Sequence, residues 1–543
     1  MIIRPRTSRL DRVVVLAFSS WIGAAFPALL WADNGATPLP AAGKVLTPLP
    51  AEQPIPPKVK FKTRNPIDQF IAKKWQDHGI RPAPLCSDED FLRRVSLDIT
   101  GVIPSLQQST RFLKPRTRNR PKLIDELLNS HRYADHWTIH WGDLLREKSR
   151  VYGMPEFAFR DYIRDSLREN KPYDEWVMEM ITAEGTAEDS TAIGLIMGHK
   201  ADANELTITT SQVFLGTQLK CAQCHDHKFE PWLQKDFEGM AAFWRGTRTR
   251  TVASDNDDQV RAVPVREVYD NGKGCGSFLT GDESALGRGR AALADLIASR
   301  ENPYFARVAV NRIWAQLMGT GIVDPPDDFS LSNPPSHPEI LDWLALEFIE
   351  HDYDVKHIIR LICNTRSYQL ASTGGALRRE IAGVRLFQRM PLRRMTAEQL
   401  HDSIVQACRV LGTDQQRFRP AIEKRYPAPG RSFRGRFGSH DRQSVHDRDT
   451  EATIPQALEL MNGRFINEAV RLRDHHPVHL WAEGGLNESS AVRKLFMLTL
   501  TRKPTKREMR LVKGHLKEVG GTAEAWSDLQ WALINTREFM FLH

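Results

Sequence analysis

The sequence predicts a mainly α fold with two helical domains, joined by an irregular segment that contains a short β element. Three observations support this prediction. Apolar residues recur at helical spacing through most of the chain, and capping residues stand at the starts of these runs. The helical pattern lapses at residues 247–287, where Thr, Asp, Gly and Val become common. The length of 543 residues, 41% of them hydrophobic, is sufficient for two or more globular cores.

The N-terminal residues 1–32 have the layout of a secretory signal peptide. Four arginines within the first twelve residues precede an apolar run from Val13 to Leu30, and Ala32 can end the signal. We therefore expect an exported protein of the periplasm or cell surface, with no transmembrane segment after signal cleavage. The alternative is an uncleaved anchor, since about 18 apolar residues can just span a bilayer.

Residues 33–64 are rich in Pro and Ala and lack helical periodicity, so we expect an extended linker that holds the globular part away from the signal. The first domain, residues 65–246, begins with a helix in which Asn65 is the N-cap, Pro66 occupies the first turn and Gly79 is the stop. Ser87 caps the next helix. Further helical runs are expected at 121–147, 157–169, 173–183 and 234–244.

The connecting segment, residues 247–287, contains one β-like piece at 259–274 that ends in a turn signal. Helical pattern returns in the second domain, residues 288–543. One of its expected helices, at 396–411, opens with a capping box of Thr396 and Gln399. A Pro/Gly/Arg-rich loop at about 417–450 interrupts the pattern. The other helices are expected at 289–319, 337–351, 355–371, 454–472 and 525–541.

Charge and cysteine content narrow the class of protein. A formal net charge of +8 is a mild imbalance in a chain of this size, and no nucleic-acid-binding module is visible. The Arg-rich stretch "RSFRGRFGSHDRQ", residues 431–443, is expected to be a solvated loop. Of the six cysteines, the four scattered outside Cys221 and Cys224 are too few for a disulfide-framed fold, and Cys363 and Cys408 have the apolar, helical surroundings of core residues.

The strongest chemical signal is the stretch Cys221-Ala222-Gln223-Cys224-His225. In a helix the two cysteines lie on one face, so both thiols can add to the vinyl groups of a haem while the histidine ligates its iron. The sequence therefore predicts one covalent haem c bound by Cys221, Cys224 and His225, with His225 as the metal ligand. Phe229, Trp232, Phe243 and Trp244 can supply the apolar wall for this haem, although aromatics at helical spacing more often form plain core.

Several points about this motif stay open at the level of sequence. Zinc bound by both cysteines, His225 and His227 is an alternative, although adjacent Cys and His ligands are unusual for zinc. A redox dithiol and a structural disulfide are the other options. A carbonyl near Pro231 is expected to hold the tautomer of His225. The sixth iron position is either open or filled by one of Met240, His199, Met197 and His140.

Long stretches of the chain also resemble a known family. Residues from 65 onward resemble the planctomycete cytochrome-like secreted proteins (the PSCyt type), in "NPIDQFIAKKWQDHGIRPAP", "FLRRVSLDITGVIPS", "RYADHWTIHWGDLLR" and "FLGTQLKCAQCHDHKFEPWLQKDFEGMAAFW". The C-terminal half is similar to the PSD-type domain that usually follows, in "NPYFARVAVNRIWAQLMGTGIVDPPDDF" and "TIPQALELMNGRFINEA". Both are domains of unknown function. The resemblance carries over Cys221, Cys224, His225, Asp226, His227, Lys228, Gln234, Lys235 and Asp236.

These observations favour electron transfer or small-ligand redox chemistry by an exported haem protein. Its expected partner is a redox protein or, as the resemblance implies, an exported sulfatase-like protein. The alternative is an extracytoplasmic binding or scaffold protein associated with polysaccharide degradation, in which the CxxCH holds a structural metal or no cofactor. No Ser/His/Asp order, P-loop or dinucleotide fingerprint is visible, so the sequence assigns neither a catalytic residue nor an enzyme class.

Overall fold

The computed structural model describes most of the chain from residue 46 onward. The described ranges are 46–249, 251–252, 261–262, 264–268, 275–279, 286–374, 380–381, 384–408, 418–445, 448, 451–471 and 485–543. The expected signal peptide, the first part of the expected linker and much of the expected connecting segment lie outside these ranges. Within them, no helix is both long enough and apolar enough to cross a membrane.

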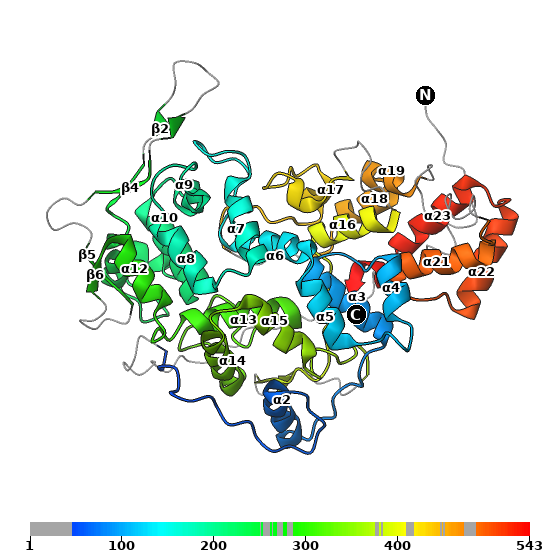
Figure 1. Ribbon diagram of the computed structural model, residues 1–543, viewed down its shortest axis with the longest axis horizontal. Coiled ribbons are helices and arrows are strands. Elements are labelled where there is room, and N and C mark those ends of the chain that lie inside the picture. Colours follow the sequence, from blue (N-terminus) through cyan, green and yellow to red (C-terminus); the bar gives the residue numbers. More distant parts are fainter. Residues whose placement is uncertain are drawn as a thin grey trace. The chain divides into compact units, whose positions relative to one another are not determined.

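Helices dominate the described residues, which confirms the mainly α prediction (Figure 1). The expected run at 121–147 consists of two helices that meet at Asn129 and Ser130. The first-half helices are α2 (Pro66–Asp77), α3 (Asp88–Thr100), α4 (Leu106–Phe112), α5 (Arg120–Leu128), α6 (His131–Leu144), α7 (Ala158–Glu169), α8 (Tyr173–Thr182), η1 (Thr191–Ile193), α9 (Gly194–Gly198), α10 (Ala203–Leu215), η2 (Lys220–Gln223) and α11 (Gln234–Ala242).

The second half is helical as well, and three of its expected helices are each divided in two. The divided runs are those at 289–319, 454–472 and 525–541. The helices are α12 (Gly289–Ala298), α13 (Phe305–Met318), α14 (Pro338–Glu350), α15 (Val355–Asn364), α16 (Ala397–Cys408), η5 (Ala421–Glu423), α17 (Phe433–Arg436), α18 (Ile454–Asn462), α19 (Arg464–Val470), α21 (Glu488–Leu500), α22 (Lys506–Glu518), α23 (Ala523–Ile534) and α24 (Arg537–Met540).

The β structure is limited to short antiparallel pairs. Five of the described strands, β1 to β5, fall in the expected β-bearing connecting segment and β6 begins at its end, while β9 pairs with the C-terminal strand β10. The pairs are β1 (Thr247–Arg248) with β4 (Arg266–Glu267), β2 (Thr251–Val252) with β3 (Arg261–Ala262), β5 (Cys275–Ser277) with β6 (Leu286–Arg288), β7 (Glu380–Ile381) with β8 (Val384–Arg385), and β9 (Arg393–Arg394) with β10 (Phe541–Leu542).

Helix starts follow the capping chemistry of the sequence. Asn65 accepts the amide of Asp68 at the start of α2, and Ser87 accepts the amide of Asp90 at the start of α3. The reciprocal bonds of the Thr396/Gln399 capping box precede α16 as expected. These local interactions explain why the sequence located many helix starts correctly.

The hydrophobic core does not divide at the expected connecting segment. One large buried cluster contains residues from both halves, from Ile67 to Val445, and a second joins three residues near α3 to the C-terminal helices. Accordingly α8 packs on α12, α10 on α13, α5 on α15, and α4 on α21, as the adjacent blue and orange helices in Figure 1 show for the last pair. The division into separable domains stays a prediction, and any separation exposes shared apolar surface.

Two buried arginines of α3 strengthen this junction. The Arg93 guanidinium donates to the carbonyls of Thr499 and Phe539, and Arg94 donates to those of Leu370 and His543. Each guanidinium thus satisfies backbone acceptors of the second half from a helix of the first half.

The described part of the expected linker, from residue 46 onward, lies against the second half. The Leu46 amide donates to the Tyr304 hydroxyl at 3.2 Å, and Arg307 donates to the carbonyl of Thr47 at 2.6 Å. The segment is extended and not helical, as expected. It is not a free spacer, however, because Leu46 and Leu49 pack on the large core cluster.

Candidate functional site

The CxxCH motif lies outside an α-helix, contrary to the helical placement used to predict haem binding. Helix α10 ends at Gly216, which has a left-handed φ of 59°. A side chain at Gly216 would approach Phe329 to 2.6 Å and Val308 to 2.9 Å, so the second half requires a glycine there. The chain then turns into η2, a 3-10 helix that ends just before Cys224.

The 3-10 turn preserves the property that the haem prediction needs. Side chains at i and i+3 eclipse one another in this helix type, so Cys221 and Cys224 project on the same side. Both thiols are exposed and neither forms a disulfide. Ala222, between them, is buried in the large core cluster and anchors the turn there. The sulfur atoms are therefore presented to solvent by a short, anchored turn.

His225 has one ring nitrogen engaged and one free. Its Nδ1 lies 2.7 Å from the carbonyl oxygen of Asp226, and because a carbonyl only accepts, Nδ1 carries the proton and donates. The ring is exposed, and its Nε2 keeps a lone pair without a protein partner among the described residues. This is the tautomer that a metal-binding histidine needs. The carbonyl comes from Asp226 and not from the region of Pro231.

His227 is engaged in the opposite way. Its Nδ1 accepts the backbone amides of Phe229 and Glu230, at 3.3 and 2.9 Å, so in the neutral ring the proton lies on Nε2. The amide of His227 itself donates to the Trp232 carbonyl at 2.8 Å. His227 thus holds the turn that follows the motif, and neither of its ring nitrogens offers a lone pair to a metal in this arrangement.

The acidic residues beside the motif organise the start of α11. The Asp226 carboxylate accepts the amide of Gln234 at 2.8 Å, and the Asp236 carboxylate accepts the amide of Leu233 at 2.7 Å. Glu230 reaches the second half, because its carboxylate accepts the Ser332 hydroxyl at 2.7 Å. These bonds explain the acidic neighbours of the motif by local folding.

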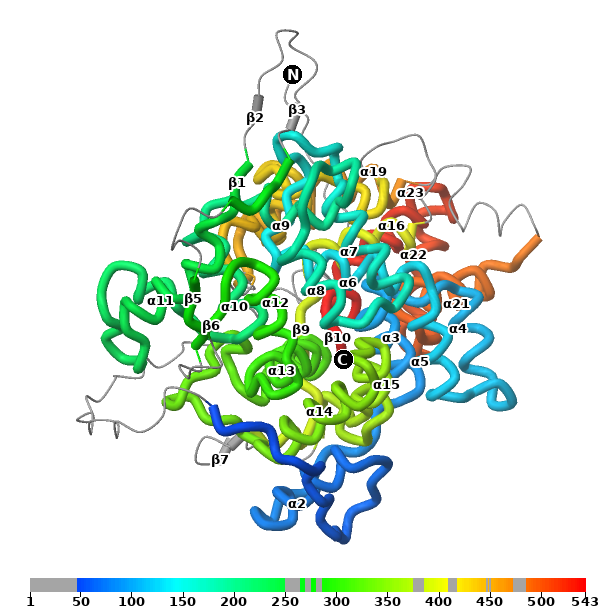
Figure 2. Tube along the Cα trace, turned by 60° about the vertical axis from the view of Figure 1, so that its left-hand side comes forward, coloured from blue at the N-terminus to red at the C-terminus, as the bar shows by residue number. Residues whose placement is uncertain are grey.

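The expected aromatic wall is not assembled beside the thiols. Trp232, Phe243 and Trp244 are buried in the large core cluster, and Phe243 fills the space above Gly276 and Gly287. Helix α11, which carries this segment, packs against β5, as Figure 2 shows. Of the four aromatics, Phe229 remains exposed, with 80% of its surface accessible. The spacing had suggested a haem pocket, but these rings form ordinary core.

Most expected sixth ligands are committed elsewhere. His199 uses both ring nitrogens, Nδ1 to the Leu195 carbonyl at 2.8 Å and Nε2 to the Thr209 hydroxyl at 2.9 Å. Met197 and Met240 are buried in the core. The Nε2 of His140 is enclosed and without a partner, and burial lowers the pKa of this ring to about 4. None of these groups shares the exposed surface of His225.

Comparison with protein families agrees with the sequence resemblance. Residues 66–249 match PSCyt2, described as a protein of unknown function (DUF1549), and residues 289–516 match PSD1, described as a protein of unknown function (DUF1553). The chain carries a PSCyt2 domain followed by a PSD1 domain. The CxxCH lies near the end of the PSCyt2 match. No curated protein and no solved structure matches the chain.

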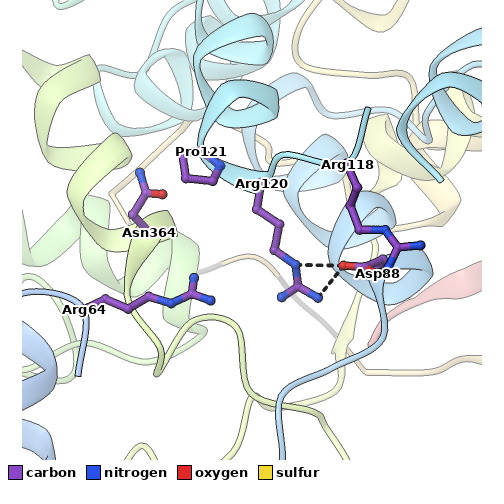
Figure 3. Close-up of a pocket in the computed structure, with 6 residues that line it drawn as sticks. All are labelled: Arg64, Asp88, Arg118, Arg120, Pro121 and Asn364. Carbon is purple, nitrogen blue, oxygen red and sulfur yellow. Dashed lines mark hydrogen bonds and ion pairs between the residues drawn. The ribbon is translucent and has the colours of Figure 1, made fainter. Parts of the chain in front are cut away.

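A second candidate site is an arginine-lined cavity of about 480 Å³ (Figure 3). Arg118 and Arg120 of the PSCyt2 domain share the Asp88 carboxylate, at 2.7 and 2.8 Å. Arg64 points toward Arg120 in Figure 3 and has no carboxylate partner among the described residues. Burial and the positive charge of Arg120 lower the pKa of Arg64. The cavity is lined by Arg64, Asp88, Arg118, Arg120, Pro121 and Asn364.

The sequence did not predict this cavity, because the residues that line it come from separate parts of the chain. Arg64 comes from the chain before α2, Arg118 from the segment before α5 and Arg120 from the first position of α5, while Asn364 belongs to the PSD1 domain. The "RTRNRP" stretch at 116–121 is a local signal of positive charge, but nothing in it indicates that Arg64 lies opposite.

Proposed function

We propose that the PSCyt2 domain carries one covalent haem c, attached at Cys221 and Cys224, with His225 as the proximal iron ligand. The observation that carries this proposal is the pairing of two free, exposed thiols on one 3-10 turn with an exposed imidazole whose Nε2 is unengaged. Export to the periplasm or cell surface belongs to the same proposal, because the N-terminal sequence has the layout of a signal peptide.

When bound, such a haem supplies an iron that exchanges single electrons. The chain's own residues define how the group is held. The Asp226 carbonyl keeps the proton on Nδ1 of His225, and His227 holds the following turn through two backbone amides. Of the neighbouring aromatics, Phe229 is exposed and would be available to a haem held by these residues, because the others are committed to the core.

A surface position favours electron exchange with a protein partner. The motif is flanked by three exposed lysines, whereas the nearby carboxylates of Asp226 and Asp236 accept backbone amides. This distribution fits a redox partner with an acidic face. The sequence candidates for a second axial ligand would not be available to such a haem in this arrangement, since they are buried or hydrogen-bonded. The lysines are Lys220, Lys228 and Lys235.

The test is haem staining of the protein exported from a host that attaches haem covalently. On a denaturing gel we expect peroxidase stain at the mass of the chain itself. The double variant Cys221→Ser/Cys224→Ser should lose the stain, whereas Cys275→Ser, which removes another exposed free thiol, should keep it. A colourless wild type whose bound zinc disappears in the double variant would replace the haem by a zinc site.

The alternative of an extracytoplasmic binding protein is favoured by a separate observation, the arginine-lined cavity. The Arg64 guanidinium donates to Oε1 of Gln369 at 2.5 Å but has no carboxylate partner among the described residues, and it faces Arg120. It suits a ligand with a carboxylate, sulfate or phosphate group. An acidic sugar has this chemistry and agrees with a role in polysaccharide degradation.

Calorimetric titration with galacturonate and with inorganic sulfate tests this second function. We expect Arg64→Ala to weaken binding at least tenfold, while Arg81→Ala, which removes an exposed arginine outside the cavity, leaves it unchanged. Equal binding by the wild type and Arg64→Ala would remove the cavity from consideration, and binding of sulfate alone would argue against sugars.

A further inference from the structure

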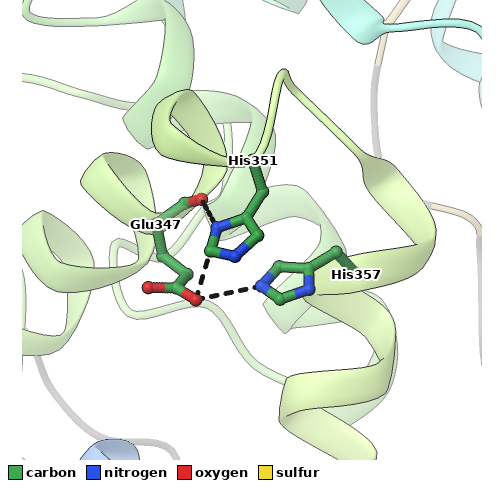
Figure 4. A group of neighbouring side chains, drawn as sticks. All are labelled: Glu347, His351 and His357. Carbon is green, nitrogen blue, oxygen red and sulfur yellow. Dashed lines mark hydrogen bonds and ion pairs between the residues drawn. The ribbon is translucent and has the colours of Figure 1, made fainter.

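A group of three potential metal ligands lies in the PSD1 domain, away from both sites above. Glu347 on α14, His351 at the end of α14 and His357 on α15 offer ligand atoms that all lie within 4.8 Å of one another (Figure 4). No other such group of three or more His, Cys, Asp and Glu residues occurs in the described ranges. In particular, the CxxCH residues do not form one.

The backbone holds the two histidines together through a tight turn. His351 follows Glu347 by four positions, so the two side chains share one face of α14. Asp352 and Tyr353 then both have left-handed φ values, 50° and 53°, which reverse the chain within a few residues. The buried Tyr353 ring anchors this turn by packing on Phe348. The reversal places His357, in the first turn of α15, against His351.

The three side chains point toward one another. The Nε2 of His357 lies 3.0 Å from Oε1 of Glu347. The Nδ1 of His351 lies 3.5 Å from the same oxygen and donates to the backbone carbonyl of Glu347 at 3.0 Å, so its Nε2 keeps the lone pair. The two imidazole rings lie 3.9 Å apart between centroids, at an angle of 12°. Figure 4 shows both rings facing the carboxylate. The 3.0 Å separation between His357 and Glu347 is that of two ligands that each lie about 2.0–2.1 Å from one metal ion.

The carboxylate is further positioned by the N-terminal segment. Gln53 donates from Nε2 to Oε2 of Glu347 at 2.9 Å, which leaves Oε1 directed at the histidines. The same nitrogen lies 3.3 Å from Glu350. An amide that holds the outer oxygen of a ligating carboxylate is a frequent feature of metal sites, where it orients the ligand.

We propose that Glu347, His351 and His357 bind one divalent transition-metal ion, for which zinc is the natural occupant. Two imidazoles and one carboxylate are a zinc ligand set that leaves a fourth position for water. Glu347 and His357 are largely buried, with side chains 13% and 20% exposed, and supply a fixed pair of ligands. His351 is 46% exposed, and a turn of its ring exchanges the Nδ1 bond to the Glu347 carbonyl for presentation of Nε2 to the ion. Binding through Nε2 of His357 requires the proton on that nitrogen to move to Nδ1 of the same ring.

Equilibrium dialysis against zinc, followed by elemental analysis, tests the site in the full-length protein. We expect one zinc ion per chain in the wild type, and at least a tenfold loss of affinity in His357→Ala and in Glu347→Gln. Gln53→Ala should weaken binding by a smaller factor, since it only orients Glu347. Circular dichroism and thermal unfolding without zinc identify any variant that fails to fold.

Two controls separate this site from the rest of the molecule. His78→Ala removes an exposed histidine at the end of α2, as His351 is at the end of α14, and should leave zinc binding intact. The Cys221→Ser/Cys224→Ser variant should also retain the ion, which distinguishes this site from zinc at the CxxCH. Absence of zinc binding by the wild type, or unchanged affinity in the folded His357→Ala variant, would overturn the proposal.

Discussion

The CxxCH turn and the charged cluster beneath α6 both contain ionisable side chains, but these side chains are exposed at the turn and buried in the cluster. At the turn, two thiols and an imidazole are exposed, and the Nε2 of His225 has no protein partner among the described residues. Beneath α6, carboxylates and guanidiniums are buried and bonded to one another. The α6 cluster consists of Asp143, Glu147, Arg160, Glu398, Arg442 and Arg448.

The partners of Arg442 show how fully the α6 cluster is satisfied. Its guanidinium, 1% exposed, pairs with Asp143 at 2.9 Å and with Glu147, and it stacks 3.8 Å above the Tyr426 ring. Burial acts to raise the pKa of Glu398, but the Arg448 guanidinium outweighs it, and the pKa lies below the ordinary value. Few hydrogen-bond donors or acceptors of the α6 cluster therefore remain available to a substrate.

This difference distinguishes charged groups that stabilise the fold from exposed groups that can bind a ligand. Buried ionic groups joined across two halves of a chain stabilise one arrangement of those halves, because an unpaired member is costly. Exposed groups with an unused lone pair contribute little to folding and remain able to bind a ligand. Loss of one member should therefore disturb stability at the α6 cluster and ligand binding at the CxxCH turn.

The largest effect on stability is expected from Arg442→Met. The substitution leaves Asp143 and Glu147 short of one counter-charge in a buried site, which costs about 3–5 kcal/mol. Urea unfolding at neutral pH measures the change. Arg425→Met is the matched control, because its pair with Glu156 is exposed and screened by solvent, so its loss should change stability far less. Similar losses in both variants would remove the distinction between buried and exposed pairs.

A decrease in pH should destabilise the protein already at pH values above those at which its carboxylates become protonated. Burial lowers the pKa of His136 and His337 to about 3, and that of His140 and His199 to about 4, from 6.5 in the unfolded chain. At a pH between the pKa in the folded state and the pKa in the unfolded state, the unfolded chain binds more protons than the folded protein. The free energy of unfolding therefore falls as pH decreases from 6.5 toward 4. Each such histidine contributes up to about 1.4 kcal/mol per pH unit.

Urea midpoints measured at intervals between pH 7 and pH 4.5 test this dependence. We expect a steady decline below pH 6.5 and a shallower decline in His199→Gln, which removes one of the neutral rings. A midpoint that stays constant down to pH 5 would show that these histidines are accessible to protons in the folded protein.

Limited proteolysis tests whether the two halves separate. The composition of residues 247–287 predicts early cleavage there, but the shared core and the Arg93 and Arg94 bonds predict that the fragments remain associated. Gel filtration after cleavage should therefore yield one peak that contains both fragments. Two separate folded fragments would establish independent domains, and first cleavage within 121–183 would show that the boundary is misplaced.

The smallest effect on stability is expected from the double variant Cys221→Ser/Cys224→Ser in protein without haem. Both thiols are exposed and unpaired, so the urea midpoint should change by no more than the equivalent of about 0.5 kcal/mol. Cys363→Ser provides the contrast, because this thiol is fully buried in the core. A large loss in the double variant would assign the motif a structural role.

Local sequence signals predicted much of the fold and part of the site. Caps at Asn65, Ser87 and Thr396 located helix starts, because their hydrogen bonds involve neighbours within three positions. The CxxCH was placed in a helix by its i, i+3 spacing, whereas α10 ends at Gly216 before the motif. The order of PSCyt2 and PSD1 follows from contiguous sequence.

Features that depend on distant partners were beyond local reasoning. The Arg-rich stretch at 431–443 was expected in solvent, yet Arg442 is buried against Asp143, 299 positions earlier. The aromatics after the CxxCH were assigned to a haem wall because their spacing cannot reveal that strands β5 and β6 cover them. Glu347 and His351 have helical spacing, but the turn that brings in His357 depends on the burial of Tyr353.

The most direct test of the central claim compares the visible spectra of His225→Ala and His227→Ala in haem-loaded protein. His225 has the free Nε2, while His227 is committed to the amides of Phe229 and Glu230. We therefore predict that His225→Ala loses the histidine-ligated spectrum although the thioether bonds remain, and that His227→Ala keeps it. Equal loss of the metal in both variants would contradict the haem proposal and identify the two histidines as joint ligands of a small ion.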